Sequence, residues 1–198
     1  NHLEAKIWER KTGQEIFSLL RGGALPNAVA FSSDGKFILT GGRDGEVVLY
    51  NLETGRAVKA FKGHYKAVFC VAFSPGGQFI LTGSKDKTVK LWDRNTGKEV
   101  QTFLGHTESV NAVIFSPDGK FILTGSSDQT AKLWDRESGL LLQSFDHNGA
   151  VYDVAFHPDS GRLILTGCGD HDYHLFENRL FELEHGYLSN GLIPAEEE

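Results

Sequence analysis

Short apolar runs alternate with turn sequences between Phe103 and Asp135. The apolar runs cover residues 110–115, 121–126 and 130–135, and they are separated by Ser-Pro-Asp-Gly at 116–119 and by Ser-Asp at 127–128. Short apolar runs bounded by proline, glycine and aspartate are typical of β-strands joined by tight turns. The pattern therefore predicts three strands of a small antiparallel sheet.

The same pattern recurs every 42 residues. Residues 61–102 and 103–144 align without a gap and share 24 of 42 identical positions by direct count. The aromatic residue that ends the third run keeps this interval at Trp8, Tyr50, Trp92, Trp134 and Phe176. The turn aspartate keeps it at Asp44, Asp86, Asp128 and Asp170. A strand-rich unit repeated at this interval predicts a fold built from stacked copies of one small sheet.

The repeat resembles that of the WD-repeat β-propeller family. Gly-His precedes its first strand and Trp-Asp ends its third, and the interval lies within the roughly 40–45 residues of that family. The resemblance extends from Lys6 to about Glu184 and implies an all-β propeller of four-stranded antiparallel blades. It implies a propeller segment over residues 1–184, with blade boundaries near 20, 62, 104 and 146, and an acidic C-terminal tail over 185–198.

Strand counting predicts an incomplete propeller of about 4.5 blades. Two strands, at 4–9 and 14–20, are followed by four blades of four strands, the last of them weak at 180–183. Such a segment has an open edge at each end, which soluble proteins normally avoid. The chain also lacks methionine and begins with Asn1 at a turn position. We therefore expect part of a seven-bladed ring, the alternative being five blades, with the remaining strands supplied by a longer chain or another copy.

A polar set recurs in two of the repeats. Its members are His64, Ser84, Asp86 and Trp92 in one repeat and His106, Ser126, Asp128 and Trp134 in the next. Serine, histidine and aspartate together invite a catalytic interpretation, but catalytic machinery has no reason to be copied in each blade. The resemblance implies a structural network instead: the aspartate contacts the histidine, the histidine contacts the hydroxyl, and the hydroxyl contacts the indole N–H.

The repeats differ in how much of this set they carry. We expect the serines to supply the hydroxyl, with Thr82 and Thr124 on the same strand face as the less favoured donors. The repeats that have Tyr50 and Phe176 at the position of the tryptophan lack the full set. We therefore expect the second and fifth blades to be more loosely held.

Composition narrows the range of functions. A net charge of −6 disfavours nucleic acid, because phosphate binding needs a basic surface. No apolar run approaches the roughly 18 residues of a membrane span. Cys70 and Cys168 are expected as buried thiols, which favours a cytoplasmic location. The cluster at 168–174 has metal-ligand residue types, but the repeat gives two of its members structural positions, so we predict no metal and no cofactor.

Function is then expected on the surface. In the family, the loops before the first strand and between the second and third strands lie on a common docking face. Here those loops carry Tyr65, Lys66, Lys85 and Arg43, an aromatic residue with flanking cations that suits an acidic or phosphorylated peptide or protein. Scattered solvated charge is the alternative interpretation of these side chains.

Two classes of function remain. We expect a non-catalytic scaffold or sensor module that binds a protein or peptide. The alternative is a hydrolytic or metal-dependent propeller with its chemistry in the central channel. The first strands that line such a channel are mostly apolar, and Asn111 and Asp153 are their only candidate catalytic residues.

Overall fold

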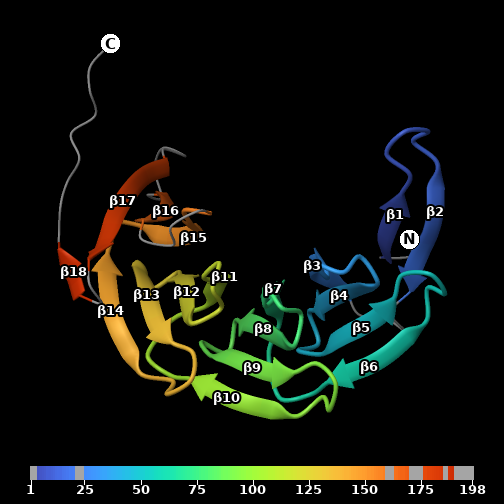
Figure 1. Ribbon diagram of the computed structural model, residues 1–198, viewed down its shortest axis with the longest axis horizontal. Coiled ribbons are helices and arrows are strands. Elements are labelled where there is room, and N and C mark those ends of the chain that lie inside the picture. The colour runs from blue at the N-terminus through green and yellow to red at the C-terminus, as the bar shows by residue number, and fades with distance from the viewer. Residues whose placement is uncertain (1–3, 21–24, 159–162, 170–175, 185–186, 190–198) are drawn as a thin grey trace.

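The computed structural model describes residues 4–20, 25–158, 163–169, 176–184 and 187–189 (Figure 1). Within these residues the chain forms eighteen β-strands and no helix. The first ten strands are β1 (Glu4–Trp8), β2 (Glu15–Leu20), β3 (Pro26–Phe31), β4 (Phe37–Gly42), β5 (Val47–Asn51), β6 (Ala57–Phe61), β7 (Val68–Phe73), β8 (Phe79–Ser84), β9 (Val89–Asp93) and β10 (Glu99–Phe103). The others are β11 (Val110–Phe115), β12 (Phe121–Ser126), β13 (Thr130–Asp135), β14 (Leu141–Asp146), β15 (Ala150–Phe156), β16 (Leu163–Gly169), β17 (Phe176–Glu184) and β18 (Tyr187–Ser189).

The strands form one two-stranded sheet and four four-stranded sheets. β1 pairs with β2, and the other sheets have the orders β3-β4-β5-β6, β7-β8-β9-β10, β11-β12-β13-β14 and β15-β16-β17-β18. All pairs are antiparallel between neighbours in sequence. Figure 1 shows the sheets arranged in an open arc, with β3, β7, β11 and β15 nearest its centre. This is the expected all-β, incomplete propeller, and we call its sheets blades one to five in chain order.

The Ser-Pro-Asp-Gly sequence closes the hairpin between β11 and β12. The Ser116 hydroxyl donates to the Asp118 carboxylate at 2.6 Å, and the amides of Lys120 and Phe121 donate back to these two side chains at 3.0 and 2.9 Å. Gly119 takes a φ of +71°, a conformation that glycine adopts without steric cost. The turn signal in the sequence is therefore a set of local hydrogen bonds together with one residue in the left-handed region.

The core lies between blades rather than within one. Leu81 of β8 packs in one cluster with Val113 and Phe115 of β11, from the next blade. Leu39 and Leu123 occupy the same position in two further clusters, and all three leucines are fully buried. The middle strands are apolar on both faces because each contacts a neighbour on either side.

The C-terminal blade differs from the prediction in its outer strands. Residues 180–183 were expected to form the fourth strand, but they belong to the third strand, β17, which runs unbroken to Glu184. That stretch contains no glycine or proline to end a strand before Gly186. The fourth strand is β18, paired with β17 from Glu182↔Ser189 to Glu184↔Tyr187, so the predicted tail over 185–198 is wrong at 187–189. Residues 190–198 lie outside the described part of the chain.

Close contact between blades can be tested at Gly125. A Cβ atom on this residue would lie 2.7 Å from Cγ1 of Val151 in the next blade, well inside van der Waals contact. Gly125→Ala should therefore lower the free energy of unfolding by about 1–3 kcal/mol through overpacking. The control is Gly76→Ala, because a Cβ at Gly76 meets no heavy atom within 4 Å and should change stability by less than about 0.5 kcal/mol. Equal urea midpoints for the two variants would contradict this packing.

Candidate functional site

A buried polar network joins four side chains of blade three. His64 precedes β7, Thr82 lies on β8, Asp86 lies in the turn after β8, and Trp92 lies on β9. Nδ1 of His64 is 2.8 Å from Oδ2 of Asp86, and Nε2 of His64 is 2.7 Å from the Thr82 hydroxyl. The Trp92 indole donates to the same hydroxyl at 2.9 Å. The network therefore joins the loop, the turn and two strands of the blade.

The chemistry of these groups determines where the protons lie. An ionised carboxylate can only accept, so Nδ1 of His64 donates to Asp86. When Nε2 carries no proton, it accepts the proton of the Thr82 hydroxyl, whose oxygen accepts from Trp92. One direction of donation, from indole to carboxylate, satisfies every group in the chain of contacts. Because each atom has a partner, burial of this set carries no desolvation penalty for an unpaired polar group.

The expected role of the serines is wrong. Ser84 bonds instead to the carbonyl of Lys66 at 3.2 Å, and it accepts from the Asp86 amide at 3.0 Å. Thr82 and Ser84 share a strand face, but Ser84 is the last residue of β8 and lies at the turn. Thr82 pairs in register with Lys90 of β9, and Trp92 lies two residues further along the same face of β9. This register places the Thr82 hydroxyl within hydrogen-bonding distance of the Trp92 indole.

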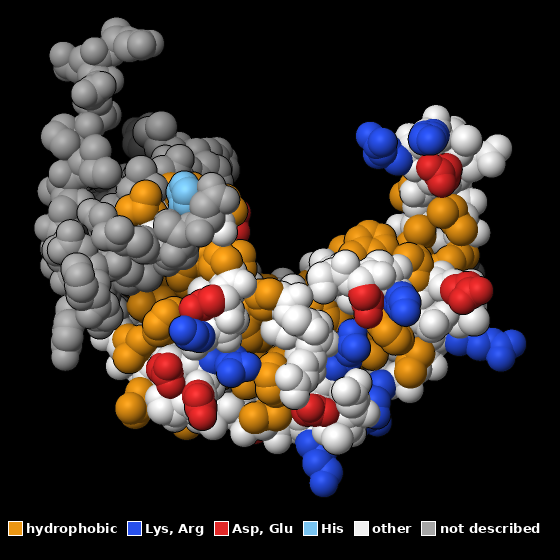
Figure 2. All heavy atoms as spheres, in the orientation of Figure 1, with side chains coloured by type: hydrophobic (Ala, Val, Ile, Leu, Met, Phe, Trp, Pro, Cys, Tyr) orange, Lys and Arg blue, Asp and Glu red, His pale blue; other side chains and the backbone are white. Residues whose placement is uncertain are grey.

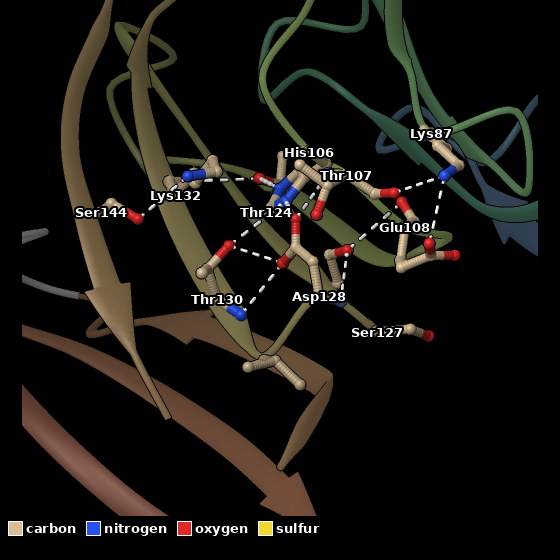
Figure 3. A network of polar contacts seen from close by, with 12 residues as sticks. Lys87, His106, Thr107, Glu108, Thr124, Ser127, Asp128, Thr130, Lys132 and Ser144 are labelled. Carbon is tan, nitrogen blue, oxygen red and sulfur yellow. Dashed lines mark hydrogen bonds and ion pairs between the residues drawn. The ribbon is translucent and has the colours of Figure 1, made fainter. Parts of the chain in front are cut away.

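Blade four repeats the arrangement. His106 is 2.8 Å from Asp128 and 2.7 Å from Thr124 (Figure 3). The Trp134 indole donates to Thr124 at 3.0 Å. Ser126 again bonds to backbone groups, here the carbonyl of Glu108 and the amide of Asp128. The carboxylate, imidazole and hydroxyl follow the order of a catalytic triad. The hydroxyls of Thr82 and Thr124 are fully buried and already hydrogen-bonded, so a substrate cannot reach them.

Hydrogen bonds stabilise the ionised form of both network aspartates. Burial by itself raises the pKa of the Asp86 carboxyl, but hydrogen bonds from His64 and Thr88 outweigh this effect and lower that pKa from 3.8 to about 2. At Asp128 burial likewise raises the pKa of the carboxyl, but hydrogen bonds from His106 and Thr130 outweigh this effect and hold that pKa well below its ordinary value. Both carboxyls therefore remain charged acceptors in the folded blades.

The predicted partner-binding residues gather at one end of the strands. Tyr65 and Lys66 lie in the loop before β7, Arg43 in the turn after β4, and Lys85 in the turn after β8; all four side chains are exposed. The turn after β4 approaches this loop so closely that a Cβ on Gly45 would lie 2.6 Å from the His64 carbonyl oxygen. The Lys85 amide donates to the carbonyl of Ala67, in the same loop, at 2.8 Å.

Tyr65 is held in place although it is exposed. The residue has 73% of its surface accessible, the largest such fraction among the exposed large hydrophobic residues of the described chain. Its hydroxyl donates to the Asp86 carbonyl at 3.4 Å, and its amide donates to the Asp86 carboxylate at 3.3 Å. The Lys66 ammonium lies 5.7 Å from the ring centroid, a cation–π distance.

Lys87 belongs to the same face, although the predicted set omits it. Its ammonium contacts the Thr107 carbonyl and lies 3.1 Å from the Glu108 carboxylate, which belong to the loop before blade four. Lys87 has a φ of +75°, at the position where blade two has Gly45. The signal in the sequence is this aligned turn position, but its contact with the next blade depends on blade order in space.

The other candidate residues have structural contacts. The Asn111 amide donates to the Val151 carbonyl of the next blade at 3.0 Å and to Ser127 at 3.0 Å. Asp153 is exposed and accepts from the Val154 amide at 2.9 Å. Across the residues placed by the structure, no group of three or more His, Cys, Asp or Glu side chains could hold a metal ion. Residues 170–174 of the cluster at 168–174 lie outside the described chain.

Comparison with known families identifies the repeat. The family model described as WD domain, G-beta repeat matches residues 17–51, 55–93, 97–135 and 139–177. The chain belongs to the WD-repeat family. The matched repeats are offset from the blades: residues 55–93 contain the outermost strand of blade two and the first three strands of blade three.

Two similar proteins are informative about architecture. A chain in the crystal structure of a mitotic checkpoint complex superposes with a TM-score of 0.84 at 24% identity, over 95% of this chain and 59% of that one. Over 54 residues, the chain is 37% identical to the human peptidylprolyl isomerase domain and WD repeat-containing protein 1; this match covers 27% of the chain and 8% of the human protein. The chain therefore spans only part of each relative's length. The structural likeness, at this identity, shows the WD-repeat fold.

The WD repeats of blades two and five carry incomplete networks. Blade two has Tyr50 where its neighbours have tryptophan, and the fully buried Thr40 hydroxyl has no hydrogen-bond partner among the described residues. In blade five, His147 keeps the contact to Thr166 at 2.7 Å, but its Nδ1 lies 3.0 Å from the carbonyl of Phe145. Asp170, which we expected in this network, lies outside the described chain.

The threonine hydroxyls give a matched pair of substitutions. Thr82→Val should leave the Trp92 indole and the His64 ring without a buried partner, at a cost of about 2–3 kcal/mol in the free energy of unfolding. Thr40→Val replaces an unpartnered hydroxyl with a methyl group of similar size and should be neutral or stabilising. Urea denaturation of both variants measures the contrast. A loss at Thr40 as large as that at Thr82 would show that the network does not account for the difference.

The lowered pKa of Asp86 predicts a pH dependence. Because the carboxyl has a lower pKa in the folded state, its contribution of roughly 2 kcal/mol is fully present above pH 4 and is lost as the pH falls towards 2. The stability difference between wild type and Asp86→Asn should therefore shrink over that interval. Glu137→Gln, at an exposed position, is the control and should follow wild type. A difference that stays constant from about pH 5 to pH 2.5 would contradict the assignment.

Proposed function

We propose that this WD-repeat segment is a non-catalytic scaffold or sensor module that binds an acidic or phosphorylated peptide over Tyr65, Lys66, Lys85 and Arg43. WD-repeat propellers are generally protein-interaction scaffolds, and one similar chain is part of a mitotic checkpoint complex. The observation that carries the finer proposal is the exposed but restrained ring of Tyr65. An aromatic side chain already fixed by the Asp86 carbonyl loses little conformational freedom when a partner covers it.

The charges around Tyr65 favour an anionic ligand. Lys66 lies on the same loop as this ring, and Lys85 and Arg43 lie on the two turns next to that loop. Lys87 extends the positive charge towards blade four, although Glu108 partly neutralises it. Cationic and acidic side chains are interspersed over the face of the molecule drawn in Figure 2, and on the candidate face Lys87 pairs with Glu108. A ligand must therefore match a local cluster of cations rather than a uniform positive field. Carboxylate or phosphate groups spaced to meet two of these cations supply that match.

Catalysis in the central channel has less support. Asn111 uses its amide to join blades four and five, and Asp153 accepts from a neighbouring backbone amide. Neither residue lies in a group of ligand-type side chains within the described chain. We also propose a cytoplasmic location, supported by two cysteines that remain thiols and lie in separate blades. No described helix is long and apolar enough to cross a membrane.

The test compares three single substitutions against one selected peptide. A library of acidic and phosphoserine peptides is screened against the wild-type chain, and the tightest ligand is carried forward. Tyr65→Ala should weaken its binding by about 2 kcal/mol or more, which is roughly thirtyfold in Kd. Lys85→Glu should mainly slow association, with an effect that fades as ionic strength rises, because steering by exposed charges is screened by salt.

Lys120→Glu provides the control at the opposite end of the strands. Lys120 lies in the turn between β11 and β12 with an exposed side chain, so it carries the same charge change away from the proposed face. Its binding should match that of wild type. If Lys120→Glu abolishes binding while Tyr65→Ala and Lys85→Glu retain it, the ligand binds at the other end of the blades.

A further inference from the structure

Lys132 of β13 is a buried cation that lacks a counter-ion. The residue has 8% of its surface accessible, and its ammonium donates to the Ser144 hydroxyl of β14 at 3.0 Å (Figure 3). Among the described residues, that hydroxyl is the only partner of the ammonium. Removing an ammonium from water costs free energy that one neutral hydroxyl does not recover in full. A carboxylate brought to this place would therefore be bound favourably.

Blade three shows which counter-ion a lysine at this position uses. Lys90 aligns with Lys132 in the repeat. Its ammonium lies 2.7 Å from the Glu99 carboxylate and 2.9 Å from the Thr102 hydroxyl. Thr102 also donates to the second oxygen of that carboxylate at 2.6 Å. Because Ser144 aligns with Thr102, blade four keeps the cation and the hydroxyl of this arrangement.

Blade four lacks the carboxylate of this arrangement. In blade one, Lys6 and Glu15 hold the same two positions and form an ion pair at 2.7 Å. Blade two has Val48 and Ala57 there, so it carries neither charge. In blade four the lysine is present, but Leu141 holds the position of the glutamate. Blades one to three thus have both members of the pair or neither, and blade four has the cation alone.

The place of the missing carboxylate is not filled by Leu141. In blade three, a Cβ on Gly63 would lie 3.3 Å from Oε2 of Glu99. Gly105 aligns with Gly63, and a Cβ on it would meet only the Trp134 ring within 4 Å, its sequence neighbours aside. The Glu99 side chain is 39% accessible, so the equivalent place in blade four opens to solvent.

The strand beside this place has an apolar and unprotected edge. β14 is the outermost strand of blade four, and it pairs with β13 alone among the described strands (Figure 1). Leu140, Leu141 and Leu142 are 65%, 45% and 47% accessible. Residues 140–145 carry no charge, whereas the aligned stretches of blades two and three each carry charged side chains. Charges on an exposed edge normally prevent pairing with another strand, so the edge of β14 is able to accept one.

We propose that the edge of β14 binds an extended peptide with one glutamate between apolar residues at alternate positions. The peptide backbone pairs with β14, and the glutamate carboxylate takes the place equivalent to that of Glu99, where it meets Lys132 and Ser144. A strand added to β14 lies two strand spacings, about 10 Å, from β13, which glutamate and lysine side chains together span. The apolar residues share the face of the glutamate and contact the exposed leucines.

The two parts of this interaction have different roles. Main-chain hydrogen bonds to the edge of β14 supply sequence-independent affinity. The ion pair with the buried ammonium selects a carboxylate side chain over a neutral one. None of these residues belongs to the Tyr65 patch, so the two surfaces can be tested separately.

The experiment uses a labelled peptide, Thr-Val-Thr-Glu-Thr-Val-Thr, capped at both ends to remove the terminal charges. Fluorescence anisotropy with the full 198-residue chain should show saturable binding of one peptide per chain. A matched peptide with glutamine in place of glutamate should bind about tenfold or more weakly. Lys132→Met should weaken binding of the glutamate peptide to the same extent and leave that of the glutamine peptide unchanged, because the two changes remove the same interaction.

A second chain variant fills the site from within. Leu141→Glu rebuilds the arrangement of Lys90 and Glu99, and it should weaken the glutamate peptide by about tenfold or more. Val100→Glu makes a comparable change at an exposed position of β10 and should leave binding unchanged. Circular dichroism should show equal thermal midpoints for these two variants, since both substituted residues are exposed.

Three results would overturn the proposal. The first is equal affinity of wild type for the glutamate and glutamine peptides, or no binding of either peptide. The second is binding that Tyr65→Ala abolishes and Lys132→Met retains, because the peptide would then occupy the Tyr65 patch. The third is self-association of the chain that Leu141→Glu abolishes, because the occupant would then be a second copy.

Discussion

The structure depends on blades that are apolar on both faces. β12 is buried along nearly its whole length because Leu123 packs towards blade five while Ile122 packs towards blade three. A sheet of this kind cannot be stable in water by itself, since one face or the other would remain exposed. Stability is therefore a property of neighbouring pairs of blades. Glycines such as Gly83 allow the close approach, because a Cβ there would overlap Cys70 and Val110.

The polar network acts within this packing and also positions the candidate binding residues. Tyr65 follows His64 directly, and Lys85 and Lys87 flank Asp86. The bonds from Asp86 to His64, Thr88 and the Tyr65 amide fix the loop and the turn relative to each other. Exposed side chains on both segments are then held at set positions, although they have few packing contacts of their own. A network that is structural in its chemistry thus supports a surface suited to recognition.

Much of the fold could be predicted from the sequence, because the same strands, turns and core positions recur at a constant interval along the chain. The position of Trp92 every 42 residues locates the third strand, and Ser-Pro-Asp-Gly locates the first hairpin. The choice between Thr82 and Ser84 could not be made in this way. Both residues lie on one face of β8. Only the register between β8 and β9 shows that Thr82, and not Ser84, lies within reach of the Trp92 indole.

The end of the chain shows a second limit of the sequence pattern. In blade five the turn between the third and fourth strands lacks the Thr-Gly or Ser-Gly signal of earlier repeats, so the boundary at Glu184 could not be located. Contacts between blades could not be predicted from the sequence either. Lys87 meets Glu108 because two blades are neighbours in space, whereas the sequence reports only that both residues lie in loops.

The offset between repeat and blade explains why each interface between blades depends on two successive repeats. The cluster between blades two and three draws Phe61, Ile80 and Trp92 from one matched repeat, and Leu39 and Leu49 from the preceding one. Each interface therefore combines two successive repeats, and neither repeat can complete it alone. The matched repeat over residues 17–51 likewise contributes to two places, with Leu19 in the cluster between blades one and two and the exposed pair Val29 and Phe31 on β3.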